Sequence, residues 1–95
     1  MENQHTFIKG YRDLSQDEIN LMNEIKSAGV LIQSIIDKVQ KHIVQQIDQS
    51  YAEYNEVEIG RLEYADPDAW CTAAKADLQT GLMKLTRAVA QPTTF

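Results

Sequence analysis

The 95-residue sequence has little cysteine, little proline and no long hydrophobic run. Its one cysteine, Cys71, cannot form an intramolecular disulfide and lies among alanines, so we expect a small core residue in a reducing cytosol. No apolar stretch approaches the roughly 20 residues that a transmembrane helix needs. The start, Met1-Glu2-Asn3-Gln4, lacks the basic end and apolar run of a signal peptide. These absences predict a small cytosolic protein with no membrane partner.

Basic residues are also scarce, because nine lysines and arginines stand against 14 acids and give a net charge of −5. The acidic excess lies in residues 48–68, where seven acids accompany Arg61 alone. Duplex DNA and anionic membranes need a net basic face, so we expect neither as the main partner. A small anion held by a few local cations remains compatible with this charge. Within the acidic segment, we expect Glu53, Glu56 and Glu58 to form a solvated face.

Catalytic and metal-binding signatures are missing from the sequence. His5 lies in the polar start and His42 lies beside Ile43 in a helical pattern, and neither has the spacing to Cys71 that a zinc site needs. No H-E-x-x-H motif, EF-hand loop or Gly-rich phosphate loop occurs. We therefore expect no catalytic residue, no metal, no cofactor and no enzymatic activity.

The sequence is instead rich in helical periodicity. Ser15 and Glu18 have capping-box spacing, which predicts a helix start after an arm of residues 1–14. Apolar residues then recur at three- and four-residue steps over about eight turns, which predicts a helix over about residues 15–59 with Gly60 as its end. Asp66 as N-cap and Pro67 at the first position predict a second helix over about residues 66–90.

The predicted fold is all-α, a single domain over residues 1–95 with a short N-terminal arm and two long antiparallel helices. A chain of this length buries only a little over ~60% of its unfolded surface. Two helices cannot enclose a core, because each hides one apolar stripe. Val30, Leu31, Ile36 and Val44 widen the stripe of the first helix beyond one seam. We therefore predict that copies of the chain assemble into a compact helical homo-oligomer.

The N-terminal arm carries side chains that lie outside the helical pattern. Tyr11 beside Gly10 offers a flat ring for stacking, and Lys9 and Arg12 offer cations for phosphate. Lys26 precedes a run of small residues in the first helix, which leaves room for a flat anionic ligand. The alternative, which the residues alone favour, is that the arm packs on a neighbouring subunit while its cations stay in solvent.

Two segments of the chain resemble a known protein family. The first is the run IKGYRDLS at residues 8–15, followed by Glu18-Ile19, Met22-Asn23 and Ile25-Lys26. The second is the run DLQTGLM at residues 77–83, followed by Leu85 and by RAVAQP at residues 87–92. They are similar to the opening and the C-terminal helix of the anti-CBASS type two proteins of tailed phages, which are cyclic-oligonucleotide sponges. The two segments cover roughly half the chain, and the middle matches only in helical character.

This resemblance implies a helical homohexamer that captures the signals of a bacterial CBASS immune system without cleaving them. Cyclic dinucleotides such as cyclic GMP-AMP are then expected in pockets between protomers, in the host bacterial cytoplasm. By motif, the resemblance places Tyr11 against a base and Lys26 at a phosphate. Lys9, Gly10 and Arg12 lie next to Tyr11, and Arg12 is included from that proximity alone.

The family also has a second kind of pocket, for cyclic trinucleotides near a threefold axis, and here the sequence departs from the pattern. A threonine expected at position 28 is Ala28, and Asp68 and Ala69 stand where an arginine is expected. Arg61 and Arg87 are left as substitutes, which puts trinucleotide binding in doubt. We keep Ala28 and Arg87 as candidates for this pocket.

Two other functions stay open from the sequence. One is a helical adaptor that binds a host protein through the acidic middle segment and takes up no nucleotide. The other is a phosphodiesterase of the same cyclic signals, which the lack of catalytic motifs disfavours.

Overall fold

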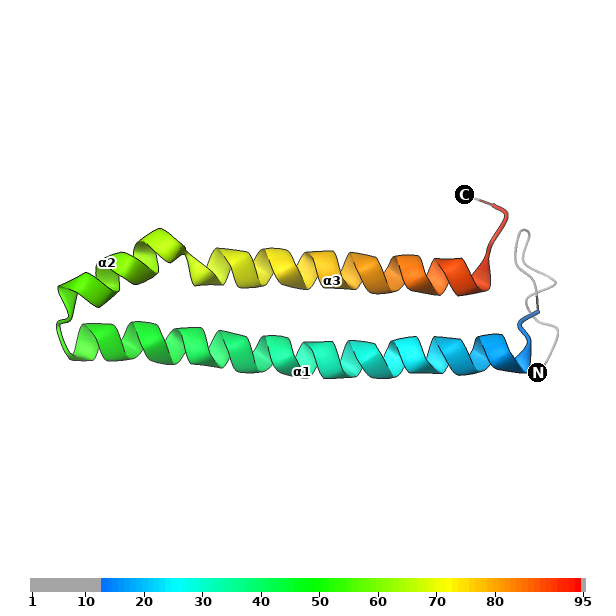
Figure 1. The fold of residues 1–95 in the computed structure, drawn as a ribbon, viewed down its shortest axis with the longest axis horizontal. Helices are drawn as coiled ribbons and strands as arrows, with labels where there is room; N and C mark the ends of the chain where they lie inside the picture. Colours follow the sequence, from blue (N-terminus) through cyan, green and yellow to red (C-terminus); the bar gives the residue numbers. More distant parts are fainter. Residues whose placement is uncertain (1–12, 95) are drawn as a thin grey trace. The chain divides into compact units, whose positions relative to one another are not determined.

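The computed structural model describes residues 13–94, which form three helices (Figure 1). They are α1 (Gln16–Ala52), α2 (Glu56–Ala65) and α3 (Pro67–Ala90). No strand occurs within residues 13–94, so the all-α prediction is confirmed for this part of the chain. The predicted arm lies almost entirely outside the described residues.

Helix α1 begins with the predicted capping box. The backbone N–H of Glu18 donates to Ser15 Oγ at 3.2 Å, and the backbone N–H of Ser15 donates to Glu18 Oε1 at 2.8 Å. Two N–H groups that lack partners in the first turn are thereby satisfied. The carboxylates of Asp17 and Glu18 also lie at the positive end of the helix dipole.

The prediction of one helix to about residue 59 is wrong, because α1 ends at Ala52. Tyr54 takes a left-handed backbone with φ 50°, which breaks the helical path. Asn55 then starts α2, since its side chain accepts a hydrogen bond from the N–H of Glu58 at 3.1 Å. Gly60 therefore lies inside α2 and does not end a helix.

Asp66 separates α2 from α3. Its backbone is left-handed, with φ 49°, and its N–H donates to the carbonyl of Leu62 at 2.9 Å, which ends α2. Pro67 is the first residue of α3, as predicted. Proline suits this position because it lacks the backbone N–H, which has no intrahelical acceptor in the first turn. The side chain of Asp66 forms no hydrogen bond with residues 13–94, so the carboxylate cap predicted for α3 is absent.

The chain divides into two compact units. Unit 1 comprises Met1–Val30 and Gln79–Phe95, and unit 2 comprises Leu31–Leu78. Within each unit, a part of α1 and a part of α3 lie side by side with opposite chain directions (Figure 1). The single domain therefore stays a prediction.

Buried apolar side chains are few in the described part of the chain. In unit 2, Ile36, Ile43 and Cys71 form a cluster against which Ile32 and Ile47 pack. Cys71 is a small core residue, as its neighbours predicted. Leu62 of α2 is the one further buried apolar residue within residues 13–94. This amount of burial is small for helices with such wide apolar stripes.

Large apolar side chains are exposed in both units. Those of unit 1 are Leu21, Val30, Met83 and Leu85, and those of unit 2 include Leu31, Ile35, Val39, Val44, Val57, Tyr64, Trp70 and Leu78. Trp70, which is 74% exposed, and Leu85, which is 55% exposed, both belong to α3. Within residues 13–94, none of the three helices combines the length and the apolar character that a transmembrane span requires. The exposed stripes have no partner among the described residues of this chain.

We expect Ile43→Val to lower the free energy of unfolding by about 1 kcal/mol, because Ile43 is 5% exposed and loses one buried methyl group. Gln45→Ala, two residues away on the exposed surface, is the control and should change the value by less than about 0.5 kcal/mol. Urea unfolding followed by circular dichroism measures both. Equal destabilisation by the two variants would contradict the assigned core.

Candidate functional site

The predicted ligand-binding residues fall on both sides of the limit of the described chain. Lys9, Gly10, Tyr11 and Arg12 lie outside the described residues. Lys26 of α1 lies in the described part of unit 1. The structure therefore describes the phosphate-binding candidate and its surroundings, and the stacking candidate stays a prediction from the sequence.

Lys26 presents an exposed cation on the surface of α1. Its side chain is exposed and forms no hydrogen bond or ion pair with residues 13–94. Helical spacing puts Asn23 and Val30 on the same side of α1, and Val30 is 74% exposed. An ammonium group next to an amide and an apolar surface is suited to an anion that also carries an apolar part.

Small residues follow Lys26 along α1. Ala28 is exposed and has no side-chain donor, so it cannot make the hydrogen bond that a threonine would make. A Cβ at Gly29 would lie 3.5 Å from Leu82 Cδ1, which is ordinary van der Waals contact. Packing within unit 1 therefore tolerates alanine at position 29, and the glycine is not explained by close approach of α3.

Arg87, the other candidate for a second pocket, lies in the last turn of α3. Its Nη2 donates to the carbonyl of Thr94 at 3.4 Å, which directs part of the guanidinium to its own chain. The side chain lines a surface cavity of about 290 Å³ with Met83, Thr86, Ala90 and Pro92. Arg87 and Lys26 both belong to unit 1.

Arg61, the other substitute for the missing arginine, is paired with an acid. Its Nε donates to Glu58 Oε2 at 2.9 Å, and its Nη2 contacts the other oxygen of the same carboxylate. The hydrogen bond from Arg61 lowers the pKa of Glu58, and the same bond raises the pKa of Arg61. A second anion would have to compete with a bidentate partner, so Arg61 is a poor phosphate ligand here.

The acidic middle segment contains no metal site within residues 13–94. Glu53 accepts a hydrogen bond from Gln49 Nε2 at 3.1 Å, and both Glu53 and Glu56 are exposed. Glu58 is partly buried and engaged by Arg61. These side chains form a largely solvated surface around the start of α2.

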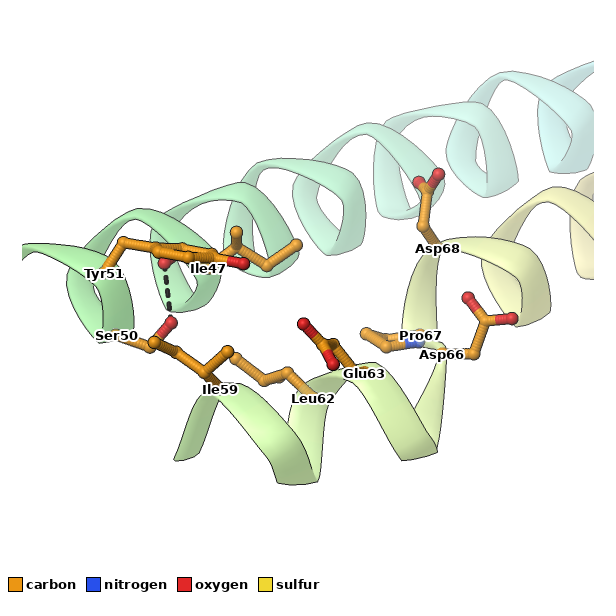
Figure 2. Close-up of a pocket in the computed structure, with 9 residues that line it drawn as sticks. All are labelled: Ile47, Ser50, Tyr51, Ile59, Leu62, Glu63, Asp66, Pro67 and Asp68. Atoms are coloured by element: carbon orange, nitrogen blue, oxygen red, sulfur yellow. Dashed lines mark hydrogen bonds between the residues drawn. The ribbon is translucent and has the colours of Figure 1, made fainter. Parts of the chain in front are cut away.

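A cavity of about 210 Å³ in unit 2 was not predicted from the sequence (Figure 2). It is lined by Ile47, Ser50, Tyr51, Ile59, Leu62, Glu63, Asp66, Pro67 and Asp68. The sequence pattern that could have predicted this cavity is the apolar pair Ile59 and Leu62. This pair lies between Asn55, which caps the start of α2, and Asp66, which ends it. That pattern describes a short amphipathic helix, whose apolar side needs a surface to cover.

The chain is similar to known proteins over nearly its whole length. The model of the family described as "Acb2/Tad1, hairpin domain" matches residues 3–90. The chain is also 37% identical to Anti-CBASS protein 2 of Pseudomonas phage JBD67 over an alignment of 105 positions, which covers 97% of each protein.

Proposed function

Because the chain belongs to the Acb2/Tad1 hairpin-domain family, we propose that it is an anti-CBASS protein, which binds cyclic oligonucleotide signals and keeps them from their effector. The observation that carries this proposal is the 37% identity to Anti-CBASS protein 2 over 97% of both chains. The resemblance seen in the sequence, at both ends of the chain, is thereby confirmed. Its site of action is the cytoplasm of the infected bacterium.

Sequestration without cleavage is the mode of action that we propose. A binder of this kind needs affinity and copy number, whereas an enzyme needs groups placed to activate water and stabilise a leaving group. The free ammonium of Lys26 supports binding, because no carboxylate of residues 13–94 neutralises it.

The ligand that we propose is a cyclic dinucleotide such as 3',3'-cyclic GMP-AMP. Tyr11 stacks on a base and Lys26 meets a phosphate, while Lys9, Gly10 and Arg12 flank the tyrosine. A base stacked on an aromatic ring contributes about 1–3 kcal/mol, and a charge-assisted hydrogen bond contributes about 1.5–3 kcal/mol. A cyclic trinucleotide is the less favoured ligand, because Ala28 offers no donor and Arg61 is engaged by Glu58.

Assembly into a homo-oligomer, a hexamer by the family resemblance, completes the proposal. The exposed apolar side chains Val30 and Leu31 of α1 and Met83 and Leu85 of α3 support it, since a second copy would remove them from water. A ligand pocket formed between protomers then depends on assembly. We propose that oligomerisation is required for capture.

We expect Lys26→Gln to weaken binding of 3',3'-cyclic GMP-AMP at least tenfold, because one charge-assisted contact to phosphate is lost. Tyr11→Ala should weaken it to a similar degree through lost stacking. Isothermal titration calorimetry measures both. Lys38→Gln is the matched control, since it removes the same charge from an exposed lysine of α1 that belongs to unit 2.

Unchanged affinity in Lys26→Gln and in Tyr11→Ala would exclude this site. An equal loss in Lys26→Gln and Lys38→Gln would show that net charge, and not the position of Lys26, governs binding. Sedimentation of each variant establishes that the assembly is unaltered.

Ligand released from the protein should be chemically intact. After incubation with 3',3'-cyclic GMP-AMP and heat denaturation, chromatography of the supernatant should recover the cyclic form, because binding alone changes no covalent bond. Linear product would support the phosphodiesterase alternative. No uptake before denaturation would support the adaptor that binds a host protein through its acidic segment.

A further inference from the structure

We propose that Asn23 is a further ligand-binding residue, and that its amide recognises the ribose 2'-hydroxyl next to the phosphate held by Lys26. Sequence motifs assigned Asn23 no role of its own. Its role rests on the proposed function, because it requires a cyclic nucleotide bound at Lys26, and it identifies a part of that ligand which the site selects.

Asn23 is the polar neighbour of Lys26 on α1. Side chains three or four positions apart on a helix are adjacent, with Cβ atoms about 5–6 Å apart. For Lys26 these positions hold Met22, Asn23, Gly29 and Val30. Met22, Gly29 and Val30 have no side-chain nitrogen or oxygen. Of these four neighbours, Asn23 is therefore the one that can form a strong hydrogen bond with a ligand held by Lys26.

The side chain of Asn23 is exposed, and it forms no hydrogen bond with residues 13–94. Its two amide donors and its carbonyl acceptor can therefore bind a ligand without giving up a partner in the described part of the chain. The amide of Asn20, three positions earlier, is already engaged, because its Oδ1 accepts a hydrogen bond from Gln16 Nε2 at 2.9 Å. The amide adjacent to Lys26 is thus the better placed of the two to contact a ligand.

The charge around Asn23 and Lys26 is compatible with an anionic ligand. Unit 1 has five acids and five bases, whereas unit 2 has nine acids and four bases, so the net charge of −5 belongs to unit 2. Glu24 is the one acid of the sequence between positions 19 and 36, and a separation of two residues puts it on nearly the opposite side of α1 from Lys26. Residues 79–90 of α3, which also belong to unit 1, contain no acid. Carboxylates therefore repel a phosphate only weakly at this side of α1.

The chemistry of the two side chains assigns them different parts of the ligand. The ammonium group of Lys26 only donates hydrogen bonds and carries a charge, which matches a phosphate oxygen. The amide of Asn23 is neutral and both donates and accepts, as a hydroxyl does. In a 3',3'-linked cyclic dinucleotide, a free 2'-hydroxyl lies on the ribose carbon next to the carbon whose oxygen joins the phosphate. Once Lys26 holds that phosphate, this hydroxyl is the adjacent group that matches the amide.

Calorimetry on the full-length protein with 3',3'-cyclic GMP-AMP and with its 2'-deoxy analogue, which lacks both hydroxyls, tests this role. Asn23→Ala should weaken binding of the ribose ligand about three- to tenfold, because one neutral hydrogen bond is lost. The same variant should weaken binding of the deoxy ligand less than about twofold, since the hydroxyl is already missing. Asn20→Ala is the matched control and should change neither affinity, because Asn20 lies about a third of a turn around α1 from Lys26.

The outcomes separate the role of Asn23 from the proposed function. Wild-type binding of both ligands with equal losses in Asn23→Ala would overturn the role, because the amide would then contact the phosphate or a base. Wild-type binding with unchanged affinities in Asn23→Ala would overturn it as well and leave the proposed function standing. If the wild type binds neither ligand, both proposals fail. Circular dichroism and sedimentation of each variant establish that the fold and the assembly are unaltered.

Discussion

A helix can bury one apolar stripe against one neighbouring helix, and this limits how much apolar surface a single copy of the chain can bury. Helix α1 carries apolar residues on more than one side, yet only Ile36 and Ile43 of that helix are buried apolar residues in the described part of the chain. Val30 and Leu31 remain 74% and 62% exposed. Water contact on this scale is unfavourable for a small domain, and further copies of the chain are the partners that we propose.

The same limit connects assembly to the proposed capture of nucleotides. Lys26 lies on a side of α1 where its neighbour Val30 is exposed, so a cation for phosphate and an apolar surface occur together. If a second protomer covers that surface, it also encloses the space around the ammonium group and strengthens its interaction with an anion by excluding water. Binding and assembly would then be favoured by the same contacts.

Local sequence signals predicted where α1 and α3 begin. Ser15 and Glu18 form the expected capping box, and Pro67 starts α3 as expected. The break after Ala52 was missed, because a left-handed Tyr54 has no strong sequence signal and Asn55 was not recognised as a cap. The burial of side chains on α3 could not be predicted from periodicity. Whether Trp70 is buried or exposed depends on which other helices cover it, and in this chain it is exposed. For the site, the family resemblance pointed to Lys26, but its exposure and the pairing of Arg61 with Glu58 required coordinates.

The mass of the wild-type protein in solution tests this account most directly. Sedimentation velocity and equilibrium across the micromolar range should give one discrete species at a multiple of 10.8 kDa, six-fold if the family resemblance extends to the hexamer. Thermal unfolding should then shift to higher temperature with protein concentration, because the partner copies stabilise the folded chain. A species of 10.8 kDa at every concentration, with a concentration-independent unfolding transition, would contradict the account.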